Sequence, residues 1–185
     1  MQRFKRGDAV FILPKFAHLY SASSGIVRDA RRDPFRSIFN EYSIEFADGS
    51  NAKLLEFQLI EDSWDYKTLV AEAVFDSREQ LAKTGARGQA SRVQIVLQAG
   101  GFDVDLKIQG QESVVRSMLG QVLETNVSNL PRQVHVRLMR EGVSLATTDT
   151  DDEGMFEFGQ VPDGSLNILL IIPQHSLRII FALSL

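Results

Sequence analysis

The sequence predicts an all-β fold in which a small barrel precedes a β-sandwich of about seven or more strands. Short segments in which apolar and polar residues alternate recur along the chain, as they do in half-buried strands. Turn signals rich in Gly, Pro and Asp separate these segments about every ten residues. We therefore expect a barrel over residues 1–61, a connector over 62–73 and a sandwich over 74–185.

The composition is that of an ordinary globular protein. Hydrophobic residues make up 44% of the 185 residues, and the formal net charge of −4 provides no overall positive field that would attract nucleic acid or anionic lipid. The chain has no cysteine, which excludes disulfides and thiol nucleophiles. Its longest apolar run, residues 166–173, is too short to span a bilayer, and the N-terminus lacks the apolar segment of a signal peptide. We expect a cytoplasmic protein that does not insert into membranes.

The first third of the chain contains five alternating segments separated by turn signals. Val10 and Ile12 alternate after a Gly-Asp pair, and Asp48-Gly49 is a strong hairpin signal between two further segments. The intervening stretch 28–40 is polar and contains a proline, so we expect a loop there. The expected strands lie at residues 8–12, 25–27, 42–46, 51–55 and 57–60.

The order of these elements carries a family resemblance. The patterns G-D-x-V, G-x-V, Y-x-I-x-F-x-D-G and a closing L-x-x-x-x-L resemble SH3-like barrels of the KOW or Tudor type. The resemblance covers about the first third of the chain. It implies a shallow groove between loops, where aromatic and basic side chains bind RNA, DNA or peptides.

The sequence of the connector is compatible with either a helix or a strand, whereas the segments after it again have the pattern of short strands. Trp64 and Tyr66 would pack between the two halves. Residues 77–91 and 124–131 are expected to be loops, the former with one helical turn. The expected strands lie at residues 74–76, 92–98, 102–108, 114–123, 134–138, 143–145 and 178–183.

The stretch 147–171 is the most informative part of the second half. It reads as a strand, an acidic turn that ends at Gly154, an alternating strand, a Pro-Asp-Gly turn and an apolar strand. Phe156 and Phe158 would face one side of the alternating strand, because strand side chains alternate. The apolar C-terminal segment is expected to be paired inside a sheet.

Several motifs in this half resemble a carboxypeptidase regulatory-like domain over about residues 68–185. They are L-G-Q-V-L at 119–123, V-x-V-x-L-M at 134–139, the T-D…D-E-G-M-F-E-F run at 148–158 and V-P-D-G at 161–164. V-F-D-S at 74–77 and G-F-D-V-D-L at 101–106 resemble the extended bacterial form of this domain, which is sometimes attached to sigma/anti-sigma regulatory proteins. The resemblance implies a transthyretin-like sandwich that serves as an accessory or binding module.

Catalytic signatures are missing from the sequence. The histidines His18, His135 and His175 are widely separated and form no H-E-x-x-H pattern, and the usual acyl-transfer and nucleotide-binding motifs are absent. The acidic turn mimics the start of a calcium loop, but Gln160 stands where the twelfth ligand should be Glu. We expect a non-enzymatic protein without a cofactor. The weak candidate metal turn consists of Asp149, Asp151 and Glu153.

Basic and aromatic residues gather in the loops of the predicted barrel. Residues 1–61 hold nine Lys/Arg and eight Asp/Glu, whereas the rest of the chain holds eleven and sixteen. Exposed rings beside basic side chains would suit a peptide, or bases and phosphates; alternatively, the rings fill the barrel core and the arginines are simply solvated. The candidate partner-binding residues are Lys15, Phe16, His18, Tyr20, Arg28, Arg31, Arg32, Phe35 and Arg36.

These observations predict a non-enzymatic interaction or adaptor protein, a bacterial regulatory or assembly component that binds a protein partner. The alternative is nucleic-acid binding through the N-terminal barrel. The sequence does not indicate the oligomeric state.

Overall fold

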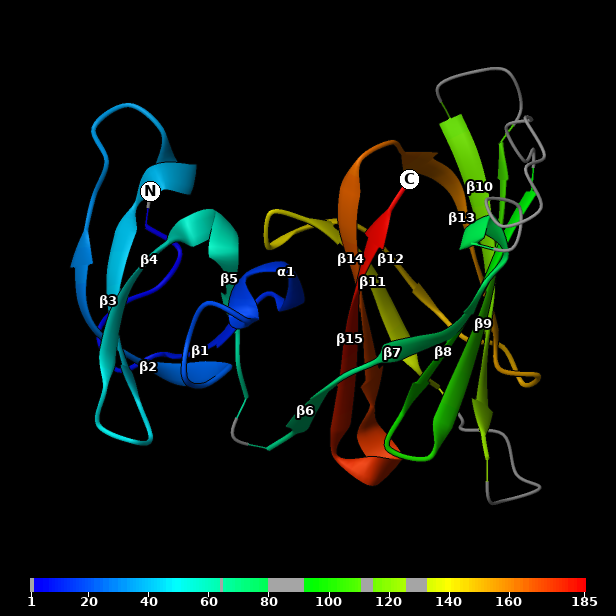
Figure 1. The fold of residues 1–185 in the computed structure, drawn as a ribbon, viewed down its shortest axis with the longest axis horizontal. Helices are drawn as coiled ribbons and strands as arrows, with labels where there is room; N and C mark the ends of the chain where they lie inside the picture. Colours follow the sequence, from blue (N-terminus) through cyan, green and yellow to red (C-terminus); the bar gives the residue numbers. More distant parts are fainter. Residues whose placement is uncertain (1, 64, 80–91, 111–114, 126–132) are drawn as a thin grey trace.

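The computed structural model describes residues 2–63, 65–79, 92–110, 115–125 and 133–185, and these residues form an all-β structure with three five-stranded sheets. In Figure 1 the N-terminal sheet lies to one side of two sheets that face each other. The predicted all-β class is therefore confirmed.

The N-terminal sheet is an antiparallel sheet whose first strand is paired on both sides. Its order is β4-β3-β2-β1-β5, and in the described part of the chain it does not close on itself, so β4 and β5 remain edges. Single helical turns interrupt it at α1 (Pro14–Ala17), η1 (Ser37–Phe39) and η2 (Glu56–Gln58). The strands are β1 (Ala9–Ile12), β2 (Ser24–Arg31), β3 (Glu41–Phe46), β4 (Asn51–Leu55) and β5 (Leu59–Glu61).

Strand β2 extends beyond the predicted strand into the predicted loop. The pairing with β3 shifts register between Val27 and Asp29 and then continues to Arg31, which pairs with Glu41. The bulge absorbs one residue, so the ladder continues although the alternation of the sequence is broken. Arg28 and Arg31 thus lie on a strand, whereas residues 28–40 were predicted to form a loop.

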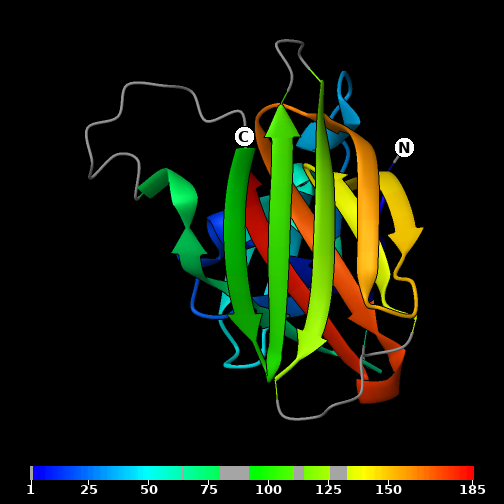
Figure 2. The ribbon, with the colours of Figure 1, turned by 90° about the vertical axis from the view of Figure 1, so that its right-hand side faces the viewer.

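The other two sheets share one apolar core. One sheet has the order β13-β10-β9-β8-β7 and the other β12-β11-β14-β15-β6. Figure 2 shows the first of these sheets face on, with β14 and β15 crossing behind it. The strands of the first are β7 (Glu72–Asp76), β8 (Arg92–Ala99), β9 (Phe102–Gly110), β10 (Val115–Glu124) and β13 (Met155–Pro162). Those of the second are β6 (Lys67–Val70), β11 (His135–Arg140), β12 (Val143–Asp149), β14 (Ser165–Ile172) and β15 (Leu177–Ser184), with η3 (Pro173–His175) between the last two.

The alternation predicted for β13 is confirmed. Phe156 and Phe158 are buried in the core between the two sheets, and their rings contact each other edge to face. Gly120 on β10 lies under this pair, and a Cβ there would come 2.1 Å from the Phe156 ring. The sequence L-G-Q-V-L therefore needs glycine at this position to make room for the ring.

Part of the predicted connector is a strand. Residues 67–70 form β6, which pairs in parallel with β15, so that the apolar C-terminal strand lies between β14 and β6. The chain then crosses at the buried Ala71 into β7 of the facing sheet. The expectations for Trp64 and for most of the predicted loops at 77–91 and 124–131 lie outside the described residues.

The apolar run in β14 has a clear cause. Its inner side chains, such as Ile168, fill the core between the facing sheets, and its outer side chain Leu169 is also buried. The N-terminal sheet covers that outer face, because Phe11 and Ile60 belong to the same buried cluster as Leu169 and Ile180. A strand buried on both faces loses the polar alternation of a half-buried strand. The whole cluster, called here the covered surface, consists of Phe11, Leu13, Ile60, Met139, Leu169 and Ile180.

A buried ion pair lies beside the covered surface. Arg178 of β15 is 5% exposed, and its Nη1 lies 3.2 Å from Asp62 Oδ1 while its Nη2 donates to the carbonyl of Glu61 at 3.0 Å. Burial lowers the pKa of Arg178, and the nearby Asp62 carboxylate opposes that shift. The N-terminal sheet is thus joined to the facing sheets by apolar contacts and by this charged contact.

Candidate functional site

Three phenylalanine rings from three connections of the N-terminal sheet form a continuous row. The ring centroids of Phe16 and Phe57 lie 5.6 Å apart, and those of Phe57 and Phe39 lie 6.4 Å apart. Both contacts are edge to face, with interplanar angles of 72° and 84°. Phe39 is 40% exposed, and the other two rings are half-buried. We call this row the aromatic strip.

Each ring of the strip is carried by a single helical turn between two strands. Phe16 lies in α1, whose first residue is a proline, as suits the first position of a helix. Phe57 lies in η2, where the Gln58 side chain accepts the Leu55 N–H at 2.8 Å. Phe39 lies in η1, and its N–H donates to the Arg36 carbonyl at 3.0 Å. Turns of this kind release the side chains from the alternation of the strands and allow the three rings to contact one another.

The buried carboxylate of Glu56 joins two of these turns through hydrogen bonds. Glu56 Oε2 accepts hydrogen bonds from the Tyr42 hydroxyl at 2.6 Å, from Asn40 Nδ2 at 2.8 Å and from the Arg3 N–H at 3.1 Å. In return, the Asn40 carbonyl accepts the Glu56 N–H at 2.9 Å, and Asn40 Oδ1 accepts the Asp33 N–H at 2.9 Å. The network therefore holds η1, η2 and the N-terminal segment in one arrangement.

Burial around this network shifts the pKa values of Tyr42 and Arg3. Burial, aided by the hydrogen bond to Glu56, raises the pKa of Tyr42. The Arg3 side chain donates to the carbonyls of Glu56 and Leu59, and burial lowers its pKa. The support of the strip therefore includes a neutral phenol that donates to the Glu56 carboxylate and a guanidinium that donates to two carbonyls.

Cations lie at both ends of the strip. Lys15 Nζ is 5.9 Å from the centroid of the Phe16 ring, and the Arg36 guanidinium carbon is 6.0 Å from that of Phe39. Arg31 and Arg32 are exposed at the end of β2, and the register places Arg31 opposite Glu41, two residues after η1. Four exposed cationic side chains therefore lie near the strip, Lys15 at the Phe16 end and Arg31, Arg32 and Arg36 on the Phe39 side.

The charges of these four residues are less compensated than those of other cations of the sheet. None of Lys15, Arg31, Arg32 and Arg36 takes part in a salt bridge within the described part of the chain, although Asp33 attracts Arg36 electrostatically. By contrast, Arg28 Nε and Nη2 bind Glu45 at 2.8 and 2.9 Å, and Lys53 Nζ lies 3.1 Å from Glu41 Oε1.

Asp33 serves mainly to shape the loop before η1. Its Oδ1 accepts the Arg36 N–H at 2.7 Å and the Phe35 N–H at 2.9 Å. These two backbone donors, with a smaller contribution from the Arg36 charge, hold the pKa of the Asp33 carboxyl below its usual range. This turn places Arg36 over Phe39 and leaves Phe35 91% exposed.

The structure brings together only part of the predicted site. Lys15, Phe16 and Arg36 meet at the strip. Tyr20 instead packs on Phe46, 6.3 Å away, and Arg28 is engaged by Glu45. The remaining predicted residues, His18, Arg31, Arg32 and Phe35, are exposed in the loops or at the end of β2.

Sequence reasoning missed Phe39 and Phe57. Phe57 was counted within the closing strand 57–60, but the strand begins two residues later, after η2. Phe39 lies in the polar stretch 28–40, where the sequence predicts only a loop. A useful signal was the combination of an aromatic residue with a neighbouring amide, Phe39-Asn40 and Phe57-Gln58, because both amides hold the turns through hydrogen bonds.

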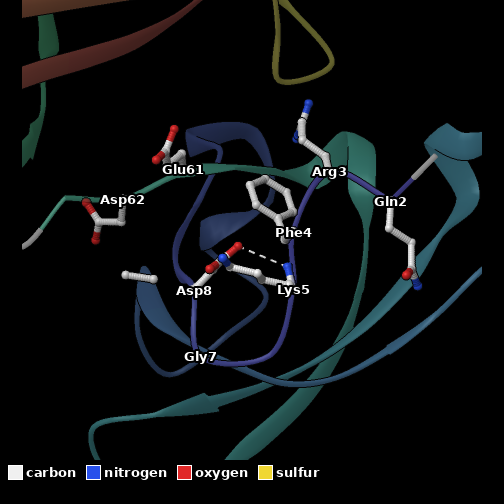
Figure 3. Close-up of a pocket in the computed structure, with 9 residues that line it drawn as sticks. Gln2, Arg3, Phe4, Lys5, Gly7, Asp8, Glu61 and Asp62 are labelled. Carbon is white, nitrogen blue, oxygen red and sulfur yellow. Dashed lines mark hydrogen bonds between the residues drawn. The ribbon is translucent and has the colours of Figure 1, made fainter.

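A hollow of about 650 Å³ lies on another side of the N-terminal sheet and is shown in Figure 3. It is lined by residues of both charges, among them Lys5, Asp8, Glu61 and Asp62. The Lys5 N–H donates to Asp8 Oδ2 at 2.9 Å, and Asp62 is bound to Arg178. Because these two carboxylates already have partners, the hollow offers fewer free groups to a ligand than the strip does.

The histidines and the acidic turn have structural contacts of their own. His135 Nδ1 lies 2.5 Å from Asp149 Oδ1, and His175 Nε2 lies 3.6 Å from Glu124 Oε2. Asp151 Oδ1 accepts the N–H groups of residues 153 and 155. Over the described ranges, no three His, Asp or Glu side chains are grouped so as to hold a metal ion. Asp149 ends β12 opposite His135, and Asp151 and Glu153 belong to the hydrogen-bonded turn that follows.

None of the helices in the described residues is long and apolar enough to cross a membrane. Comparison with known proteins adds no identification, since no family model, no curated protein and no solved structure matches the chain.

Proposed function

We propose that this chain is a non-enzymatic interaction protein and that the aromatic strip binds a protein partner. The observation that carries the proposal is the row Phe16–Phe57–Phe39, partly open to solvent and bordered by cations without salt bridges among the described residues. Aromatic residues and arginine are the side chains enriched in protein interfaces, where they supply most of the binding energy. The Glu56 network supports the proposal because it fixes the strip before binding, which lowers the entropy lost on association.

We infer that the N-terminal sheet belongs to the SH3-like barrels. Its strand order, with a single helical turn immediately before the last strand, supports this inference, as does the resemblance noted in the sequence. In such barrels partners bind between the loops, and the strip is built from the connections β1–β2, β2–β3 and β4–β5. The facing sheets would then act as a scaffold, in line with the carboxypeptidase regulatory-like domain that residues 68–185 resemble. A role in a bacterial regulatory assembly in the cytoplasm is part of the same proposal.

Nucleic-acid binding is the second candidate, and one observation favours it. Phe35 is 91% exposed beside Arg31, Arg32 and Arg36, so a base could stack on its ring while phosphates meet the arginines. The strip itself argues for the protein partner. Its rings meet edge to face and two of them are half-buried, so they offer no series of parallel faces on which successive bases would stack.

A peptide-display library tests the proposed function. The full chain and an Arg36→Ala, Phe39→Ala variant are panned in parallel, with Lys107→Ala, Leu119→Ala on the outer side of the facing sheets as a matched control. We expect peptides to be enriched on the wild type and on the control but not on the strip variant. Equal enrichment on all three, or none on any, would exclude the strip as a peptide site. Fluorescence anisotropy with labelled oligonucleotides at low and moderate salt tests the alternative.

A further inference from the structure

We infer, building on the proposed function, that the strip recognises an extended acidic segment of its partner, in which Asp or Glu residues flank a short stretch with an apolar residue at every second position. The proposal names the chemistry of the partner and its backbone conformation. It follows from the charge around the strip, from the spacing of the rings and from their mutual orientation.

The charge around the strip is positive and faces solvent. Lys15 and Arg36 lie against the outer rings, and Arg31 and Arg32 lie at the adjoining end of β2. Several acidic groups nearby are already engaged: Glu41 with Lys53, Glu45 with Arg28, and Glu56 inside the buried network. Asp29 and Asp33 also lie near these arginines, and Asp33 attracts Arg36, so the four cations outnumber the remaining carboxylates. A partner that brings carboxylates would therefore form charge-assisted contacts without displacing existing pairs.

The spacing of the rings suits an extended chain. Successive ring centroids are 5.6 and 6.4 Å apart. In an extended strand, side chains on one face are two residues apart, which corresponds to about 6.5 Å. Alternate apolar side chains of such a segment can therefore contact successive rings, and acidic residues before and after them would come next to the cations at the two ends of the strip.

The orientation of the rings distinguishes a peptide from a nucleic acid. Angles of 72° and 84° between neighbouring rings produce notches between an edge and a face, which fit aliphatic or aromatic side chains. Bases need flat, accessible faces, and within the strip only Phe39 is classed as exposed.

The test uses a defined probe, a fluorescein-labelled peptide of about twelve residues in which Leu and Phe alternate with Ser at the centre and Glu residues stand at both ends. Two comparison peptides carry Lys in place of Glu, or Ser in place of Leu and Phe. We expect the acidic apolar peptide to bind the full chain and both comparison peptides to bind at least about tenfold more weakly, since each lacks one of the two kinds of contact. Binding of the first peptide should weaken as salt rises.

Charge-reversal variants locate the site. Arg31→Glu with Arg32→Glu should lower the affinity for the acidic probe about tenfold or more. Arg92→Glu with Lys107→Glu makes the same charge change on the facing sheets and should alter that affinity by no more than about twofold. Arg31→Gln with Arg32→Gln removes the charges without reversing them and should give an intermediate loss. Thermal unfolding of each variant checks that the fold is retained.

Two results would overturn the inference. One is equal binding of the Lys peptide and the Glu peptide; the other is binding of the acidic probe that the Arg31 and Arg32 changes do not affect. If the display experiment selects strip-dependent peptides that are not acidic, the inference fails while the proposed function stands. If a single-stranded oligonucleotide binds more tightly than the acidic probe and loses affinity in the same variants, the strip is a nucleic-acid site and both proposals fall.

Discussion

The N-terminal sheet presents two surfaces rich in large apolar side chains, and only one of them is covered. In the covered surface, Phe11, Leu13 and Ile60 of the N-terminal part pack against the outer face of β14 and β15. The aromatic strip, at another place on the same sheet, remains partly exposed. Phe16 contacts both, because it packs against the covered cluster and begins the strip.

The two surfaces differ in how charge is arranged around them. Beside the covered surface, Arg178 is buried and bound to Asp62 and a carbonyl. Around the strip, Lys15 and Arg36 point to solvent over ring edges and faces. A permanent contact satisfies its charges internally, since an unpaired buried charge is costly, whereas a surface that binds and releases a partner can leave them to water. The difference indicates that one surface stabilises the fold and the other serves binding.

The largest effect is expected from truncating the covered surface. Ile180 is fully buried at its centre, so Ile180→Ala should lower the free energy of unfolding by about 2–5 kcal/mol, through lost transfer energy and a residual cavity. Urea denaturation followed by far-UV circular dichroism measures this. A loss below about 1 kcal/mol would mean that the N-terminal sheet does not depend on the facing sheets for its stability.

The next largest effect should come from breaking the buried ion pair. Asp62→Ala leaves the Arg178 guanidinium with its bond to the Glu61 carbonyl only, and we expect a loss of about 2–3 kcal/mol. The Arg178→Met, Asp62→Ala double variant removes the charge as well and should recover part of that loss. If the double variant is less stable than the single one, the contact is stabilising beyond the cost of an unpaired charge.

A smaller effect, with a dependence on pH, is expected below the strip. Tyr42→Phe removes one hydrogen bond to Glu56 and should cost about 1–2 kcal/mol at neutral pH. The folded protein raises the pKa of Tyr42 above its ordinary value of 10.0, so the folded state holds the phenolic proton more tightly than the unfolded state does. That contribution is fully present below pH 10.0 and is lost as pH rises through the folded-state pKa.

The gap in melting temperature between Tyr42→Phe and the wild type should therefore narrow above pH 10.0. Calorimetric scans at neutral and at strongly alkaline pH make this comparison. A gap that stays constant across that range would exclude Tyr42 as the titrating group.

The smallest effect on stability should come from the strip itself. Phe39 is 40% exposed, so Phe39→Ala should cost less than about 1.5 kcal/mol, well below the value for Ile180→Ala. The same substitution should abolish the enrichment of display peptides. A large loss of stability without a change in peptide binding would place Phe39 with the covered surface and remove the functional distinction between the two.

The sequence predicted the strands well because a half-buried strand leaves a local trace. Alternation alone predicts a buried face that contains Val10 and Ile12, and another that contains Phe156 and Phe158. The covered surface could be predicted only in part. The apolar run of β14 predicted an apolar strand, but the element that covers its outer face is distant in the sequence.

The candidate site was harder to predict for the same physical reason. Phe39 and Phe57 reach the strip because single helical turns reorient them, and these turns depend on a buried carboxylate that binds residues 3, 40 and 42. No local pattern encodes a network of that range. Lys15, Phe16 and Arg36 were predicted because rings beside cations are a compositional signal, and they lie at the strip. The pairing of Arg28 with Glu45 could not be predicted in this way, because Glu45 lies on the next strand.

The parallel pairing of β6 with β15 has a consequence for how the chain folds. Lys67 pairs with Leu177, which is 110 residues further along the chain, whereas the strands of the N-terminal sheet are joined mostly by short connections. Contacts between distant residues form slowly, because the intervening chain must first lose entropy. The N-terminal sheet is thus expected to assemble early and to wait, with Phe11, Leu13 and Ile60 uncovered, until β14 and β15 arrive. That interval is the stage of folding at which the protein is most prone to aggregate.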